Sequence, residues 1–456
     1  MNKAQHYRSN EENDQISSKF TPNRFKLSEN YTKNQVSSVS LEGRMSRLRK
    51  SEKYIVKLTN AEAFTSTFKA LVGIGILTCP SAYKEVGIYG GISGSILITL
   101  IVSVMYNQMV SVIEQTSSAT HRTLGEISEK IFSHKIKFLV ELCILGCQLS
   151  VCISYLRYFG EQMSDLACQR TDGGFCGHRI FFAFIGVIFL TLMALLKNFK
   201  QLSLISYIAN CTVVLAFVAV CVDSAYVIGF RSTPQDIKYF ELSNYPQFLS
   251  LISLSMEGTA ILPGIYASTF DKKSYRNILG SAVFVDGFFT MILSCVAYIA
   301  YGNNTREIVI MNMSYGLISN VIQIGYAFGV LCSFALQLFP ILEVVENKRF
   351  YADLVKNVKF SDSQSEQDKI FVINMICRVI IILFVFTVSQ SIKNINFILQ
   401  LSGSVFSNAL MFIIPPCLYL KLFNGQVSIV RLGFNVIIIM LGVANALRGL
   451  YNCFQF

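Results

Sequence analysis

One acidic residue lies in the middle of a long apolar segment of the chain. Glu257 interrupts "FLSLISLSMEGTAILPGIYAS", residues 248–268, and is followed directly by Gly258 and Thr259. Inside a lipid bilayer a charge at the centre of a helix costs about 2.5–3.5 kcal/mol, so this side chain is expected to face a cavity, a partner or a proton. Three roles are open for it: holding the amine of a ligand, carrying a coupling proton, or bonding unwound backbone as a brace.

A second apolar segment is interrupted by helix breakers. In "KALVGIGILTCPSAY", residues 69–83, Gly73, Ile74 and Gly75 precede Pro80. Glycine lowers helix stability by about 1 kcal/mol relative to alanine, and interior proline by about 3 kcal/mol. The N–H and C=O groups released at such a break suit a zwitterion, whose carboxylate fits a helix start and whose ammonium fits free carbonyls. The alternative is that the glycines only allow close helix packing.

The composition indicates a membrane protein. Of the 456 residues, 52% are hydrophobic and 15% are charged, whereas a soluble domain usually has about 25% charged residues. Apolar runs recur at about the 20 residues that a helix needs to cross a hydrocarbon core. Backbone groups in lipid must bond within their own segment, so the runs are predicted to be helices. The eleven predicted spans are 62–83, 90–113, 138–158, 180–197, 203–228, 247–267, 278–300, 315–341, 370–389, 395–418 and 429–451.

The two interrupted segments are the first and the sixth of these spans, and Pro263 and Gly264 break the sixth a second time. Many transporters consist of two five-helix halves of inverted topology, in which matching helices are unwound at the bilayer midplane around the binding site. The pattern therefore predicts an all-α membrane protein with two inverted five-helix repeats and one additional helix.

The polar N-terminus differs from the rest of the chain. We predict a disordered cytosolic tail over 1–60 and a transmembrane domain over 61–453. Lys and Arg concentrate in the tail and in the loops on its side of the membrane, which predicts a cytosolic N-terminus. The net charge of +11 is then mostly a topology signal. A nucleic-acid partner is not expected, because no folded basic domain is present to bind it.

Three features of the loops are candidate sites or elements. Cys168 and Cys176 share a non-cytosolic loop, "CQRTDGGFC", and are a disulfide candidate because that side of the membrane can be oxidising. Asn303 and Asn312 begin glycosylation tripeptides in another outer loop. In "TLGEISEKIF", residues 123–132, a capping box at its start predicts a short helix along the cytosolic surface.

Other ionisable residues within the spans are expected to be structural. Glu141, Asp223 and Asp286 lie nearer the predicted span ends, where snorkelling to the interface or pairing with Arg or Lys is the expected explanation. Lys69 is expected to reach the cytosolic interface along its own stem.

Several chemistries are excluded by the sequence. No Cys/His cluster has metal-ligand spacing, and all four histidines lie outside the predicted spans, so no metal site is expected. No phosphate-binding loop is present, which argues against ATP-driven transport. No paired acid and base of a membrane enzyme is visible, and no cofactor is expected.

The chain resembles the amino acid/auxin permease family. The resemblance lies in "FKALVGIGILTCPSAYKEVG" (68–87), "SMEGTAILP" (255–263), "YGNNTREIVIMNM" (301–313), "QLFPILEVVE" (337–346) and "LSGSVFSNALMFIIPPCLYL" (401–420). It implies a LeuT-type fold, an amino acid substrate and a site formed by Gly73, Ile74 and Gly75 with Glu257, Gly258 and Thr259. The proton-coupled branch of the family carries a histidine where this chain has Ser66, which leaves Glu257, a sodium site or uncoupled exchange.

The expected function is transport of amino acids by alternating access, with H⁺ or Na⁺ as the coupling ion. A sensor of the same fold, which binds an amino acid and signals through the tail, is the main alternative, and a channel is the next. The expected location is the lipid bilayer of the plasma membrane or of a vacuolar or lysosomal membrane. The sequence does not determine the oligomeric state.

Overall fold

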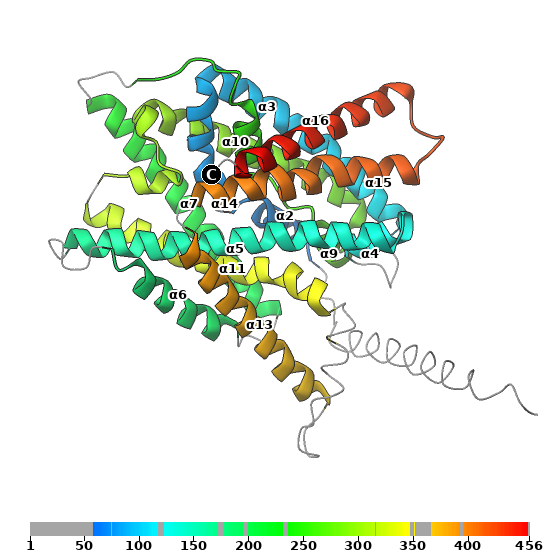
Figure 1. The fold of residues 1–456 in the computed structure, drawn as a ribbon, viewed down its shortest axis with the longest axis horizontal. Coiled ribbons are helices and arrows are strands. Elements are labelled where there is room, and N and C mark those ends of the chain that lie inside the picture. Colours follow the sequence, from blue (N-terminus) through cyan, green and yellow to red (C-terminus); the bar gives the residue numbers. More distant parts are fainter. Residues whose placement is uncertain are drawn as a thin grey trace, which may run out of the picture. The chain divides into compact units, whose positions relative to one another are not determined.

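A computed structural model describes residues 58–73, 75–116, 123–170, 177–194, 199–230, 236–314, 316–346, 351, 366–392 and 395–454. All of these belong to one compact unit, Lys57–Phe456, and the unit Met1–Val56 lies outside the described residues. The predicted tail over 1–60 therefore falls almost wholly outside them. The described part is helical (Figure 1), with one isolated parallel bridge between Leu58 and Thr269.

The α-helices are α2 (Asn60–Leu71), α3 (Gly75–Thr116), α4 (Leu124–Ile131), α5 (His134–Arg170), α6 (Arg179–Ala194), α7 (Phe199–Phe230), α8 (Tyr245–Ser255), α9 (Leu262–Ser268), α10 (Lys272–Tyr301), α11 (Leu317–Glu346), α13 (Glu366–Ser391), α14 (Ile395–Leu401), α15 (Ile414–Leu422) and α16 (Ile429–Phe454). Short 3₁₀ turns cover Gly302–Asn304 and Val309–Asn312. Two π-helical segments, Ser402–Ser407 and Ala409–Ile413, separate α14 from α15.

Within the described ranges, eight helices are long and apolar enough to cross a membrane. The predicted first and sixth spans are not among them as single helices, because each is broken. The first is divided between α2, of 12 residues, and the start of α3. The sixth is divided between α8, of 11 residues, and α9, of 7 residues. About 20 helical residues are needed for a crossing, so none of these pieces spans a membrane alone.

The position of the first break differs in detail from the sequence prediction. The helix is interrupted between Leu71 and Gly75, where Val72 is extended with φ −81° and ψ 104°. Pro80 was predicted to contribute to the break but lies inside α3. In the sixth span Pro263 lies at the start of α9, where a missing N–H costs little because the first turn has no intrahelical acceptor.

The 42 residues of α3 consist of two helices that meet at Gly87, where the backbone is not helical (φ 80°, ψ 173°), so the predicted first and second spans are separate there. The φ of Gly87 is in the left-handed region, which glycine adopts without the steric cost that a Cβ imposes. The loop before α8 packs directly on this kink. Ile88 N donates to Lys238 O at 3.1 Å, and Glu241 N donates to Val86 O at 2.8 Å.

The predicted short helix with its capping box is confirmed as α4, and its place on the cytosolic surface stays a prediction. Thr123 and Glu126 form the capping box, with Glu126 N donating to Thr123 Oγ1 at 3.1 Å and Thr123 N donating to the Glu126 carboxylate at 3.2 Å. Leu124 and Ile127 are buried, so this helix packs one face against the rest of the unit.

The loop that carries the glycosylation tripeptides is tightly hydrogen-bonded. Asn303 Nδ2 donates to Asp236 Oδ2 at 2.9 Å. Asn312 Nδ2 donates to Asn304 O at 2.9 Å, and its Oδ1 accepts from Arg306 N at 2.8 Å. Modification of either asparagine stays a prediction.

We expect Gly87→Ala to lower the midpoint of thermal unfolding. A Cβ at this position would lie 2.6 Å from Tyr239 C, and a left-handed backbone costs a non-glycine residue about 1–2 kcal/mol. Gly280→Ala is the matched control, because a Cβ there meets nothing within 4 Å. Equal midpoints for Gly87→Ala and the wild type would show that the kink is not required.

Candidate functional site

The two breaks lie directly against each other. A Cβ added to Gly75, the first residue of α3, would be 2.4 Å from Cα of Ser255, the last residue of α8. A Cβ added to Gly258 would be 3.1 Å from Leu71 Cδ2, and Leu71 ends α2. The contact at Gly75 therefore requires glycine. At this point the start of α3 touches the end of α8, and the end of α2 touches the segment that follows α8.

This crossing brings helix ends of opposite polarity together. The start of α3 carries N–H groups without an intrahelical acceptor, and the end of α8 carries C=O groups without an intrahelical donor. Their partial charges are about +0.5 and −0.5 of an elementary charge. A zwitterionic ligand at this point would find a positive and a negative helix end side by side.

Protein groups already satisfy part of the break in the sixth span. The Tyr106 hydroxyl, from α3, donates to Met256 O at 2.7 Å and accepts from Gly258 N at 2.9 Å. Glu257 Oε1 accepts from Thr259 N at 3.0 Å. The bracing role is therefore visible for Glu257, and Tyr106 shares it.

Glu257 also contacts the third predicted span. Cys147 of α5 donates from Sγ to Glu257 Oε2 at 3.7 Å and lies 3.2 Å from Ser407 Oγ in the π-helical segment. The carboxylate keeps acceptor capacity beyond these two contacts, since a carboxylate offers about four lone-pair sites.

A cavity lies beside the first break. Its volume is about 20 Å³, which is room for about one water molecule, so an amino acid requires the cavity to open further. Its lining includes Gly73, Gly75 and Glu257 from the predicted site. The other lining residues come from α2, α5, α8 and α11, namely Ala70, Leu71, Cys147, Gln148, Val151, Tyr155, Leu254 and Gln337.

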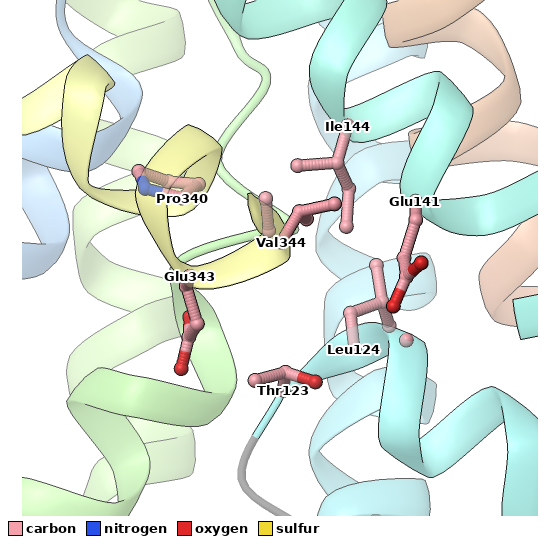
Figure 2. A pocket seen from close by; sticks show the side chains of 9 residues that line it. Thr123, Leu124, Glu141, Ile144, Pro340, Glu343 and Val344 are labelled. Atoms are coloured by element: carbon pink, nitrogen blue, oxygen red, sulfur yellow. The ribbon is translucent and has the colours of Figure 1, made fainter. Parts of the chain in front are cut away.

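A second cavity lies at the other end of the break in the sixth span. Its volume is about 10 Å³, and it is lined by Ala260 together with residues of α4, α5 and α11. Figure 2 shows Glu141 on α5 and Glu343 on α11 at opposite sides of this cavity. Ala260 follows Glu257 by three residues, so the two cavities flank the same broken segment.

Comparison with known proteins identifies the family of the chain. The family model described as "Transmembrane amino acid transporter protein" matches residues 57–455. The chain belongs to this family. It is therefore an integral membrane protein of a transporter family and not an enzyme.

Curated relatives of this transporter family are distant in sequence. Amino acid transporter AVT3B of Arabidopsis thaliana is 21% identical over 402 residues, covering 86% of this chain and 92% of the relative. Vacuolar amino acid transporter 3 of Schizosaccharomyces pombe is 22% identical, covering 80% of this chain and 53% of the relative. Vacuolar amino acid transporter 4 of Saccharomyces cerevisiae is 21% identical, covering 80% and 54%.

The structure brings together most of the predicted site residues. Gly73, Gly75 and Glu257 line the cavity. Gly258 and Thr259 are buried next to them but are not among the lining residues. Ile74 lies outside the described residues. The family resemblance implies lining from spans three, eight and ten, and residues of the third and eighth spans do line the cavity. The sequence did not assign these residues, because long apolar helices carry no local signal of which face meets a cavity.

The structure bears on two expectations about other charged residues, and the one for Lys69 was wrong. Lys69 does not reach the interface, since its side chain is buried and its Nζ has no hydrogen-bond partner within the described ranges. The Asp223 carboxylate is half-buried and accepts from Tyr301 Oη at 2.6 Å. Among the described residues it forms no ion pair with Arg or Lys, and its snorkelling stays a prediction. Cys168 is disulfide-bonded, and Cys176 lies outside the described residues, so that pairing stays a prediction.

No metal centre is visible where the chain is described. Its His, Cys, Asp and Glu side chains form no group of three or more that could hold a metal ion.

We expect Tyr106→Phe to destabilise the broken segment. The change removes one hydroxyl that bonds both Met256 and Gly258, and each buried group left unpaired costs about 1–3 kcal/mol. Tyr158→Phe is the control, because the buried Tyr158 hydroxyl has no hydrogen-bond partner in the described ranges. Thermal unfolding of the two purified variants is the measurement. Equal midpoints would contradict the bracing role of Tyr106.

Proposed function

We propose that this protein is a secondary transporter that moves amino acids across a membrane by alternating access. The observation that supports the proposal is the contact between the two broken helices, which places opposite helix ends and Glu257 around one cavity. Family membership and the names of the relatives, which include vacuolar amino acid transporters, agree with it.

The proposed fold is LeuT-type with eleven spans. If α2 with the start of α3, and α8 with α9, each count as one crossing, the first and sixth spans occupy the same position in two five-helix halves. The short apolar helix α6 would be a further crossing, and α16 would be the additional helix. The excess of Lys and Arg in the tail and the loops on its side supports a cytosolic N-terminus.

Each part of the substrate has a proposed partner. The carboxylate would meet the free N–H groups at the start of α3, beside Gly73 and Gly75, because helix starts bind anions. The ammonium would meet Glu257 and the carbonyls at the end of α8. Tyr155 Oη limits the space, since it lies 2.9 Å from where a Cβ on Gly73 would be.

The two cavities suggest how access alternates. The cavity beside Gly73 and the one beside Ala260 lie along the same broken segment. A helix already interrupted there can tilt one half without losing intrahelical hydrogen bonds. Transport would then open one cavity at a time, with H⁺ or Na⁺ as the coupling ion and a vacuolar or lysosomal-type membrane or the plasma membrane as the location.

The direct test is uptake of radiolabelled amino acids into proteoliposomes that contain the purified protein. We expect saturable uptake that is accelerated by unlabelled amino acid on the opposite face, since only a carrier shows this acceleration. Binding without flux would contradict transport and would indicate a sensor. Flux without the acceleration would indicate a channel.

We expect Glu257→Gln to reduce uptake about 10- to 100-fold, because a hydrogen bond to a charged group contributes about 1.5–3 kcal/mol. Glutamine keeps an oxygen that can accept from Thr259 N, so the brace should survive. Glu114→Gln is the control, since Glu114 is half exposed and pairs with Arg276. Full activity of Glu257→Gln would leave this residue with the bracing role alone.

A further inference from the structure

A second acidic residue is buried outside the cavity described above. Asp286 lies in the middle of α10, 14 residues after the first residue of that helix, which is about 21 Å along its axis. Its side chain is 0% exposed, and neither carboxyl oxygen has a hydrogen-bond partner within the described residues. The sequence reading of Asp286 as a paired residue near a span end is therefore wrong.

Asp286 belongs to a buried polar stripe between α10 and α3. Thr290 and Ser294 follow it at helical spacing, are buried, and also lack hydrogen-bond partners where the chain is described. A Cβ on Gly287 would lie 2.4 Å from Thr99 Oγ1 of α3, so the two helices are in direct contact at this level. Ser95 is buried on the same side of α3, one turn before Thr99.

The charged and titratable groups around Asp286 do not neutralise it. From α3, Cys79 and Tyr106 are within electrostatic range of its carboxyl group. From α2, Glu62 caps its own helix and Lys69 makes no hydrogen bond to it.

More distant charges on α7 and α10 are already paired. Asp223 of α7 is bonded to Tyr301. Arg276, on α10 itself, is bonded to Glu114 and Ser111.

We propose that Asp286 is a proton-binding site of the transport cycle, an inference that rests on the proposed transport function. An isolated ionised carboxylate in an apolar interior is so unfavourable that the group takes up a proton instead. Ionisable residues inside membrane spans are typical of proton relays. A bound hard cation would need several converging oxygens, whereas a proton needs one, and no oxygen of the described residues hydrogen-bonds to Asp286.

Tyr106 connects this site to the break in the sixth span. Its hydroxyl bonds Met256 and Gly258, and it is within electrostatic range of both Asp286 and Glu257. When Asp286 accepts a proton on one Oδ, the negative charge near Tyr106 disappears. The loss of this charge changes the electrostatic potential at the two hydrogen bonds that Tyr106 makes to the broken segment. Proton binding at Asp286 is thereby coupled to the segment that binds substrate.

The test compares Asp286→Asn with the wild type in proteoliposomes, in sodium-free buffer, with and without a pH gradient. Asparagine resembles the protonated acid but cannot titrate. We expect Asp286→Asn to keep exchange of labelled for unlabelled amino acid and to lose accumulation driven by the pH gradient. Asp286→Glu should restore that accumulation, and Asp165→Asn, at a half-exposed carboxylate paired with Arg306, should behave like the wild type.

Each other result overturns the inference in a distinguishable way. Accumulation by Asp286→Asn equal to that of the wild type would remove Asp286 as the proton site and leave the transport function standing. Wild-type accumulation that requires Na⁺ would replace the proton with a sodium ion. Absence of exchange in the wild type would overturn the transport function itself.

An infrared measurement tests protonation without relying on transport. We expect the wild-type protein to show a carbonyl stretch of a protonated carboxylic acid that disappears in Asp286→Asn and persists in Asp165→Asn. If Asp286→Asn does not fold, Asp286→Glu provides the comparison, through a shift of the same band. Identical spectra for the wild type and the folded variant would show that Asp286 is ionised and would overturn the proposal.

Discussion

The proposed substrate site depends on one close approach, in which the start of α3 packs on the end of α8 at Gly75 and Ser255. Because Gly75 has no side chain, the two interrupted helices can touch through their main chains. Gly258 packs less closely, since a Cβ there would lie 3.1 Å from the Leu71 side chain at the end of α2. These helix ends carry the backbone polar groups beside the cavity. The glycines therefore allow close helix packing and also leave backbone groups accessible to a ligand.

A break in a membrane helix must have its polar groups satisfied, and the two breaks differ in how this is achieved. In the sixth span, Tyr106 and Glu257 bond the backbone from within the protein. In the first span, Gly73 and Gly75 line the cavity. This asymmetry divides the proposed roles: the sixth span supplies a braced acidic side chain, and the first span supplies main-chain groups to a substrate.

The sequence alone predicted the breaks, the helical class and the capped helix α4, because glycine, proline and capping residues act locally. It did not predict which helix faces meet. Cys147, Tyr155 and Gln337 reach the cavity from long apolar helices whose residues give no such signal. Lys69 and Asp286 were misread for a related reason: distance from a predicted span end says nothing about whether neighbouring helices cover a side chain. The prediction of eleven spans also requires that α2 and the start of α3 form one crossing and that α8 and α9 form another. The lengths of these helices alone do not establish this.

The central claim is that the two breaks form the substrate site, and the most direct test is a cryo-electron microscopy map of the protein with a transported amino acid bound. The account predicts density for the ligand between Gly73, Gly75 and Glu257, with its carboxylate toward the start of α3. Continuous first and sixth helices, or a ligand bound away from both breaks, would contradict it.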